Sequence, residues 1–581
     1  MSFIKNYILE IKYLLSDEHK KEFNFFFLLF FLAMVLEMLG VGMILPVLNI
    51  MVNQELFFSS SFFLNLSFLN NFSQKEIIFF LIGFIFLIYV TKSLFLVFVY
   101  KREVNFLKKI RVSLSKKLFS TYIKLPYEFH INSNSGNLIR NITDIKIFIS
   151  LIIHTLSLIV ETLILLGLTF FLMLYEPIGT LTALLILSVI GLVFNFTIRK
   201  KSSYWGEQRQ KYEGLKIINT QQGLNSIKDI KILSKENYFI NTFNQSEEKA
   251  ASSVQNHDFI IRLPKIILEI TAIFILLGLL LLLINSNADF KNFIPTLGLF
   301  TLASFRIFPS IARIMRSYQI IKFGMPVVNL LKSEISRDDK KSFDFQKDKK
   351  DLKMEKNIEF KNVEFAFKNK SNFIFKNLNF SIKLGSSIGI YGNSGNGKTT
   401  FLNLLLGLIK PSQGDILIDG KYSIFENIDS WQSKIGYVPQ NIYLLEENLK
   451  SNIAFGVEKS KINDDVIIDL IKKVKLEKYF ETLKDGIDTI ISEHGENLSG
   501  GQKQRIGIAR CLYNNPKLII LDEATNALDK STAKEIIQEI NELRGDKTII
   551  IISHDSETLK NCDEIYNLDE GNLVLTNNKN F

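Results

Sequence analysis

Six long apolar stretches in the first 315 residues constrain this chain more than any other feature. A helix that crosses a bilayer needs about 20 residues at a rise of about 1.5 Å per residue, and each stretch meets that length. The stretches are 23–51, 77–100, 147–175, 178–198, 263–284 and 293–315. The sequence therefore predicts an all-α transmembrane domain of six spans within residues 1–330. The first run is too long for a signal peptide, so we expect no cleaved leader.

The positions of Lys and Arg predict how these spans are oriented. Basic residues cluster before the first span, after the second and after the fourth, whereas 53–76, 176–177 and 285–292 carry at most one lysine each. We therefore expect both termini in the cytoplasm. The excess of 69 Lys and Arg over 59 Asp and Glu is explained by these clusters, so we expect no nucleic-acid partner. The only cysteines, Cys511 and Cys562, fit a reducing compartment.

Two cytoplasmic connections, 104–146 and 200–262, keep the apolar rhythm of helices, so we expect the helices to continue beyond the bilayer. Polar, glycine-containing breaks occur near 127–137 and 223–233. Short helices there would dock onto a soluble domain; the alternative is an ordinary hairpin tip. Between the first two spans, 53–76 alternates Phe and Leu with Ser and Asn. This pattern favours a helix in the outer membrane interface over a loop held against the bundle.

The second half has the pattern of a different fold. Alternating Asp and Lys over 337–356 indicate a solvated linker, which we place at 331–356. From residue 357 to 581, short apolar strands alternate with turns and helices, as in α/β domains. The predicted fold is therefore multidomain, with a six-helix transmembrane domain followed by an α/β P-loop domain.

A phosphate-binding motif opens this second domain. The apolar strand 387–391 runs directly into Gly392-Asn-Ser-Gly-Asn-Gly397-Lys398-Thr399-Thr400, which an apolar helix follows. In such a loop, glycines let backbone N–H groups turn towards phosphate oxygens at a helix N-terminus. Lys398 supplies a positive charge for the β- and γ-phosphates, and Thr399 offers a hydroxyl to Mg²⁺. The motif predicts a nucleotide triphosphate site.

Further polar residues stand at the ends of other predicted strands. Asp522 and Glu523 end the strand 518–522, and their carboxylates suit Mg²⁺ and a general base for the attacking water. Gln440 and His554 follow two other strands. Strand ends are where nucleotides bind in open α/β sheets. Residues 498–502, Leu-Ser-Gly-Gly-Gln, have small side chains that leave backbone N–H groups open to a γ-phosphate.

In this order and spacing, the motifs resemble the nucleotide-binding domain of ABC transporters over residues 357–571. The resemblance implies an ATP hydrolase that uses ATP and Mg²⁺. It implies that Glu523 is the catalytic base, with Gln440 and His554 as further catalytic residues, and that Mg²⁺ is held by Thr399, Gln440 and Asp522. The implied nucleotide contacts are Phe367, Gly392, Asn393, Ser394, Gly395, Asn396, Gly397, Lys398, Thr399, Thr400 and the signature residues Ser499, Gly500, Gly501 and Gln502.

Two departures from the family pattern are mild. Asn526 stands where Ser is usual, and His494 precedes Gly495 where a second Gly is common. We expect neither to touch a group needed for hydrolysis. Six spans before one nucleotide domain resemble the exporter type, in which ATP lies between the phosphate loop of one subunit and the signature of the other. One complete motif set per chain then implies a homodimer with two composite ATP sites, and the two cytoplasmic breaks become coupling helices.

Ionisable residues inside the spans are costly and therefore indicate function. The basic ones expected in the inner half of the membrane are Lys92, Lys265, Arg306 and Arg313. Doubled in a dimer, they predict a basic ring for a phosphate or pyrophosphate, because Arg pairs well with its oxygens. The alternative is that Lys265 and Glu269 only satisfy each other at i and i+4, with Arg313 and Arg316 solvated.

The membrane half also resembles PglK-type flippases of lipid-linked oligosaccharides, in the segments 53–76, 262–269 and 304–318. Lys92 and Lys265 stand where that family tends to have Arg. The resemblance implies that a polyprenyl-pyrophosphate glycan, as used in protein glycosylation, moves from the cytoplasmic to the outer leaflet. The Phe, Ile, Asn and Lys bias is typical of an AT-rich bacterial genome, so we expect the inner membrane. The alternatives are an exporter of a lipid A-like lipid or phospholipid, or an ATP-gated channel or regulator.

Overall fold

The computed structural model describes residues 2–43, 74–175, 177–285, 290–341, 352–367, 373–492 and 495–576. The chain divides into two compact units, Met1–Leu125 with Asn132–Ser342, and Pro126–Ile131 with Phe343–Phe581. The segment 53–76, expected in the outer membrane interface, lies outside the described residues up to Gln74, where a helix begins.

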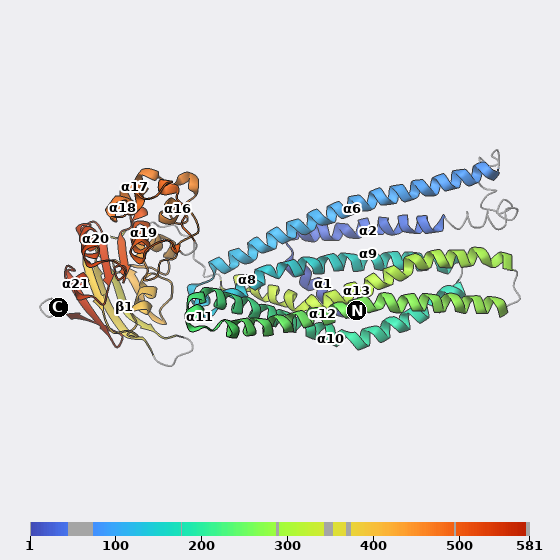
Figure 1. The fold of residues 1–581 in the computed structure, drawn as a ribbon, viewed down its shortest axis with the longest axis horizontal. Helices are drawn as coiled ribbons and strands as arrows, with labels where there is room; N and C mark the ends of the chain where they lie inside the picture. Colours follow the sequence, from blue (N-terminus) through green and yellow to red (C-terminus); the bar gives the residue numbers. More distant parts are fainter. Residues whose placement is uncertain are drawn as a thin grey trace. The chain divides into compact units, whose positions relative to one another are not determined.

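The first unit consists of helices, and Figure 1 shows the long ones lying side by side. Four of them have 49 to 52 residues, which at about 1.5 Å per residue is far longer than the roughly 30 Å bilayer core. The prediction that helices continue beyond the apolar stretches is confirmed. The helices of this unit are α1 (Ser2–Leu14), α2 (Asp17–Gly42), α6 (Gln74–Lys124), α8 (Ser135–Thr143), α9 (Ile145–Tyr175), α10 (Pro177–Asn225), α11 (Ile227–Leu233), α12 (Glu236–Asn285) and α13 (Phe290–Lys341). The short helix α7 (Tyr127–Asn132) belongs, apart from Asn132, to the second unit.

Short helices occupy both predicted cytoplasmic breaks. α7 and α8 lie in the first, and α11 lies in the second. Asn134 caps α8 by accepting a hydrogen bond from the backbone N–H of Gly136, and α11 ends at Ser234 in the left-handed conformation. Polar caps of this kind stop one helix and start the next, which explains the breaks. Their role as coupling helices stays a prediction.

The number of spans also stays a prediction. Within the described residues, three segments are long and apolar enough to cross a membrane: Asp17–Gly40, Ile78–Lys124 and Ser135–Leu174. A shorter apolar stretch, Gly179–Phe194, lies in α10.

Helix α13 extends past residue 330 into the predicted linker. Val328, Leu331 and Ile335 are spaced by three and four residues and are all buried, so one face of the helix stays in contact with the bundle. The charged residues that follow do not interrupt the helix until Lys341. Apolar spacing was therefore the better guide to this boundary than charge.

Glycines bring α13 close to its neighbours. A Cβ on Gly206 of α10 would lie 2.0 Å from the carbonyl oxygen of Phe323, and one on Gly324 would lie 2.4 Å from a methyl of Leu151 in α9. Glycine is therefore the residue that fits both contacts. The contact between α9 and α13 continues in a buried cluster of Ile164, Leu168, Leu172, Ala303 and Ile307.

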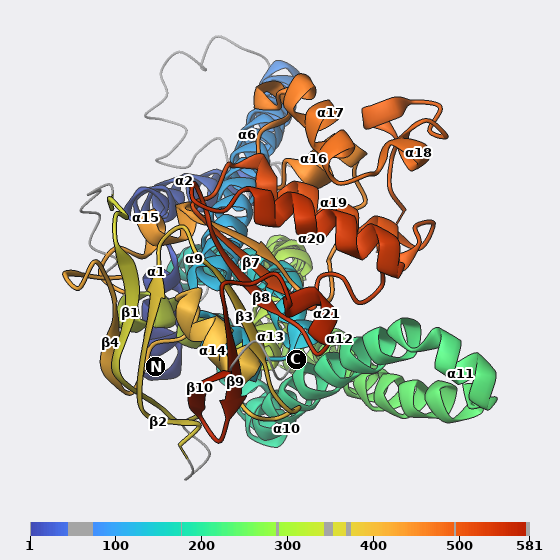
Figure 2. The same ribbon diagram turned by 90° about the vertical axis from the view of Figure 1, so that its left-hand side faces the viewer.

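The second unit contains two sheets, visible in Figure 2. The antiparallel sheet has the order β2-β1-β4-β5, and the larger sheet has the order β10-β9-β3-β8-β7-β6. The strands are β1 (Asn357–Phe365), β2 (Phe375–Lys383), β3 (Ser387–Tyr391), β4 (Gln413–Ile418), β5 (Tyr422–Ser423), β6 (Ile435–Val438), β7 (Leu518–Asp522), β8 (Thr548–Ile552), β9 (Glu564–Asp569) and β10 (Asn572–Thr576). The helices are α14 (Lys398–Leu405), α15 (Ile428–Ser433), α16 (Leu449–Ile453), α17 (Asp464–Lys473), α18 (Glu477–Phe480), α19 (Gly500–Tyr513), α20 (Lys530–Glu542) and α21 (Ser556–Leu559).

The central strands explain where the site lies. β3, β8, β7 and β6 pair in parallel, so their carboxyl ends meet at one edge of the sheet. β8 is buried along its whole length, as expected for a strand covered on both faces. Helix α14 is held beside this edge by Phe401, whose ring stacks on Phe360 with centroids 5.0 Å apart. A rigid framework thus presents the strand ends and the start of α14 together.

Candidate functional site

The phosphate loop connects β3 to α14. Gly395 and Gly397 adopt φ values of +94° and +97°, a region that other residues rarely enter. A Cβ on Gly392 would lie 2.4 Å from the carbonyl oxygen of Leu568, so the loop also passes close to the next strand. Gly397 caps α14 without a side-chain hydrogen bond. The N–H groups at the start of α14 are therefore available to an anion.

Side chains fix this loop from two directions. Asn396 donates to the carbonyl of Leu568 and to the Asp569 carboxylate at 3.1 and 3.0 Å. Lys398 Nζ donates to the carbonyls of Gly392 and Asn393 and lies 3.1 Å from His554 Nε2. Partial burial lowers the pKa of Lys398, while the nearby charges of Glu523 and Asp522 oppose that shift. The ammonium is thus held over the loop, where a phosphate would offer a stronger partner.

The remaining loop residues differ in their exposure to solvent. Asn393, Ser394 and Thr399 are exposed, whereas Thr400, in the first turn of α14, is buried. Phe367 follows β1, and its ring meets Phe365 edge-on at 5.1 Å. It is half-buried, and the described residues stop immediately after it. Its contact with adenine stays a prediction.

Two carboxylates face the loop from the end of β7. Burial raises the pKa of Asp522, with a further contribution from the charge of Glu523, while a hydrogen bond from Tyr437 and the charge of Lys398 lower it. The Tyr437 hydroxyl lies 3.3 Å from Asp522 Oδ2. A partly buried carboxylate beside the Tyr437 hydroxyl and the phosphate loop fits Mg²⁺, which is usually held by one or two carboxylates together with phosphate oxygens. Asp522, Thr399 and Gln440 are the residues that would hold it.

Glu523 is the most constrained acid of the site. Its backbone has φ = +50°, which places the side chain off the strand direction. Gln440 Nε2 donates to Oε2 at 2.7 Å, and Asn526 Nδ2 donates to the same oxygen at 3.0 Å. His554 Nε2 lies 3.1 Å from Oε1. Because that nitrogen also lies 3.1 Å from Lys398, it either accepts from Lys398 or donates to Glu523, depending on its proton.

One expectation is wrong. We expected Asn526 to touch no group needed for hydrolysis, yet its amide contacts the carboxylate of Glu523, the predicted base. The reason is a turn: the backbone N–H of Asn526 donates to the carbonyl of Glu523 at 3.2 Å, which folds residue 526 back over residue 523. The contact of Tyr437 was also missed. Its position in β6, beside β7, is a signal that could have found it.

The signature residues make a different set of contacts. Ser499 caps α19 through a reciprocal pair with Gln502, in which each side chain accepts from the other residue's backbone N–H, at 3.2 and 2.7 Å. Gly500 and Gly501 face Ala527 and Leu528, where an added Cβ would lie 3.1 and 3.2 Å away. The sequence predicts that this motif meets the ATP of a second copy, and that stays a prediction.

Comparison with known families agrees with this geometry. A model of the ABC transporter family matches residues 375–526, and a model of the ABC transporter transmembrane region matches residues 25–307. The chain belongs to the ABC transporters. A solved structure described as a bacterial Atm1-family ABC exporter with ATP bound has a TM-score of 0.78 and covers 94% of this chain and 95% of its own at 21% identity. The fold is therefore that of an ABC exporter.

Two curated relatives add detail on this ABC transporter. The ATP-dependent lipid A-core flippase of Haemophilus influenzae is 35% identical over 216 residues, which are 37% of each chain. The match therefore spans little more than a third of that relative. The uncharacterized ABC transporter ATP-binding protein YwjA of Bacillus subtilis is 28% identical over 481 residues, 81% of this chain and 80% of its own. The resemblance to oligosaccharide flippases stays a prediction.

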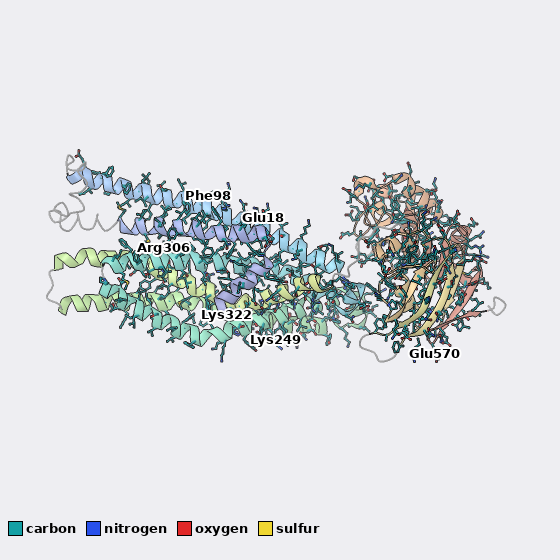
Figure 3. The ribbon with its side chains drawn as sticks, turned by 180° about the vertical axis from the view of Figure 1, so that it is seen from behind. Glu18, Phe98, Lys249, Arg306, Lys322 and Glu570 are labelled. Carbon is teal, nitrogen blue, oxygen red and sulfur yellow. The ribbon has the colours of Figure 1, made fainter. Side chains whose placement is uncertain are left out.

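In the helical unit of the transporter, three basic residues of the predicted anion site are paired with buried carboxylates. Lys92 of α6 lies 2.8 Å and Arg306 of α13 lies 2.7 Å from the two oxygens of Glu37 in α2. The Glu37 side chain is only 6% exposed. Arg306 lies among the long helices in Figure 3, and its Nε makes no hydrogen bond although it is close to the carboxylate. One carboxylate thus serves two cations.

Arg313 and Lys265 each have a carboxylate partner of their own. Arg313 makes a two-pronged pair with Glu161 of α9, at 2.5 and 3.1 Å. Lys265 lies 3.8 Å from Glu269 one turn along α12, and both side chains are mostly exposed, at 78% and 64%. The ion pair at i and i+4 that the alternative interpretation named is therefore present. Arg313 has a full partner, whereas Lys92 and Arg306 share one.

Proposed function

We propose that two copies of this chain form an ATP-driven exporter that moves an anionic lipid from the cytoplasmic to the outer leaflet of a bacterial inner membrane. The proposed substrate is a polyprenyl-pyrophosphate-linked oligosaccharide. The observation that carries this proposal is the charge around Glu37. Lys92 and Arg306 are only partly neutralised by it, so each subunit keeps one excess positive charge inside the bundle.

The proposed energy source is ATP hydrolysis at the edge of the larger sheet. Backbone N–H groups of Gly392–Thr400 and the ammonium of Lys398 bind the phosphates, and Glu523 accepts a proton from the water that attacks the γ-phosphorus as ADP leaves. Asp522, Thr399 and Gln440 would hold Mg²⁺, which would supply positive charge to the phosphates. Phe367 stacks on adenine, and the signature Ser499–Gln502 of the second copy closes the site.

The proposed head-group site uses the guanidinium of Arg306 and the ammonium of Lys92. A pyrophosphate offers several oxygens and more than one negative charge, so it competes with the single carboxylate of Glu37 better than a neutral head group does. Arg313 and Lys265 extend the site when their own pairs open. In this proposal, the segment 53–76 helps to receive the head group at the outer leaflet. The coupling helices near 127–137 and 223–233 transmit the conformational change of the ATPase domain to the spans.

A second candidate is export of a lipid A-like lipid. It is favoured by two relatives named lipid A-core flippases, which share 35% and 34% identity with this chain over 37% and 38% of its length. Lipids of both kinds share phosphate groups on an amphiphile, so the described charges suit either. A channel or regulator remains a third use of the scaffold.

Reconstitution in liposomes distinguishes these candidates. Fluorescent lipid-linked oligosaccharide and fluorescent lipid A are each tested for ATP-dependent transfer between leaflets, with Glu523→Gln as the inactive control. We expect transfer of the oligosaccharide lipid and stimulation of ATP hydrolysis by it. Transfer of lipid A alone would favour the second candidate, and ionic current in the Glu523→Gln protein would favour a channel.

A further inference from the structure

We propose that Asn526 is a positioning residue that selects which oxygen of Glu523 acts as the base. The inference rests on the proposed ATP hydrolysis and concerns a contact that the sequence did not predict. Two amides, from Gln440 and Asn526, donate to Oε2 of Glu523 at 2.7 and 3.0 Å. A carboxylate oxygen has two lone pairs in its plane, so these two donors saturate Oε2.

Saturation of Oε2 leaves Oε1 to act. This oxygen faces His554 at 3.1 Å, and His554 in turn lies 3.1 Å from Lys398, the residue that binds the phosphates. Oε1 is therefore the oxygen on the side where the γ-phosphate and its attacking water belong. Two donors that fix the rotation of the carboxylate hold the base in its reactive orientation. Less conformational entropy is then lost on reaching the transition state, so the rate rises.

The side chain of Asn526 is separable from the turn that carries it. The turn is held by backbone donors: Asn526 N–H to the Glu523 carbonyl at 3.2 Å and Leu528 N–H to the Thr525 carbonyl at 3.0 Å. The N–H of Ala527 also donates to the Gln504 side chain at 3.1 Å. None of these bonds uses the Asn526 amide, so its replacement leaves the turn in place.

The test compares Asn526→Ala and Asn526→Asp in the full-length protein. Loss of a hydrogen bond to a charged group is expected to lower kcat about ten- to hundredfold in Asn526→Ala, with little change in KM for ATP. In Asn526→Asp, two carboxylates about 3 Å apart hold a proton between them near neutral pH, so the acid limb of the pH–rate profile moves to higher pH. Movement of that limb shows that residue 526 lies against the base itself, and a lower kcat of Asn526→Ala at unchanged KM shows that the amide positions this base.

Asn561→Asp is the matched control, since it adds the same charge at an exposed position. We expect it to keep the wild-type kcat and pH profile. Wild-type kcat and an unmoved pH profile in both Asn526 variants would overturn the positioning role, and so would loss of ATP binding in both, which indicates a structural role. Absence of hydrolysis by the wild-type protein would instead overturn the proposed function.

Discussion

At the residue scale, the fold disfavours the ionised form of Asp522 in the nucleotide site. Asp522 lies at the end of a buried strand, and its burial raises the pKa of its carboxyl above the ordinary value of 3.8. Tyr437 and Lys398 compensate only in part. Functional sites often contain such groups because a bound cation later supplies the missing partner.

Replacing Asp522 should therefore stabilise the empty protein. The carboxyl ionises first in the unfolded chain, so it costs stability as the pH rises from 3.8 through its raised folded value, and the cost persists at neutral pH. We expect Asp522→Asn to unfold at a higher temperature than wild type at neutral pH without Mg²⁺, and to show no difference near pH 4. Stabilisation by Mg²⁺ and ATP should be lost. A thermal unfolding series tests this, with the exposed Asp546→Asn as control.

At the element scale, the helical unit depends on close approach between α13 and its neighbours. The contact at Gly206 joins α10 to the backbone of α13, and the contact at Gly324 joins α13 to α9. Side chains of ordinary size would separate these helices, and the ion pairs that cross between them need the short distance. Packing and charge pairing in this unit are therefore linked.

A methyl group at Gly206 tests this link. An added Cβ would lie 2.0 Å from a backbone carbonyl, which cannot rotate away, so Gly206→Ala should lower stability by about 1–3 kcal/mol. Gly191→Ala in the same helix is the matched control, because its Cβ would meet nothing within 4 Å. We expect that control to keep or slightly raise stability, since Ala favours helices. Thermal unfolding in detergent measures both, and equal effects would argue against the contact.

The triad of Glu37, Lys92 and Arg306 joins three helices. Its net charge can be lowered by replacing Arg306 or raised by replacing Glu37. Arg306→Ala should keep basal ATP hydrolysis and lose transport, because Lys92 alone is neutralised by Glu37. Glu37→Gln should instead strengthen binding of an anionic lipid, because it frees both cations. The exposed Arg316→Ala, on the same helix, is the control. Binding and transport in liposomes measure the effects; equal loss of hydrolysis and transport in Arg306→Ala would indicate a structural role.

At the scale of the whole molecule, each chain carries one set of motifs, and its signature contacts its own Ala527 and Leu528. If ATP lies between two copies, a chain with a defective phosphate loop can still supply a working signature to its partner. The proposed homodimer therefore predicts complementation between two inactive variants, which a monomer would not show.

Two inactive variants should restore activity when combined. Lys398→Ala removes the phosphate-binding ammonium, and Ser499→Arg blocks the signature with a bulky cation. A mixed dimer keeps one composite site with both parts intact, so partial ATP hydrolysis should return on coexpression. Measuring the hydrolysis of purified mixed dimers, selected by two different tags, tests this. No recovery would mean that each chain completes its site alone.

The fold class and the location of the phosphate site could be predicted from the sequence, because both depend on local patterns. Apolar runs and short-range motifs act locally: a strand that enters Gly392–Thr400 must form a phosphate cradle, and four parallel strands must bring 440, 522, 523 and 554 to one edge. The fold class and the family were confirmed on this basis. Local pattern was weaker at boundaries, as the extension of α13 to Lys341 demonstrates.

Only the tertiary structure decided which charges meet. Glu37, Lys92 and Arg306 are far apart in the chain and converge because three helices pack side by side. The contact of Asn526 with Glu523 is local, because a turn with a left-handed residue redirects the chain over three residues, but the sequence pattern did not reveal that turn. Sequence determines which groups a chain possesses and the periodicity of its elements, whereas the pairing of distant side chains depends on packing that emerges only when those elements come together.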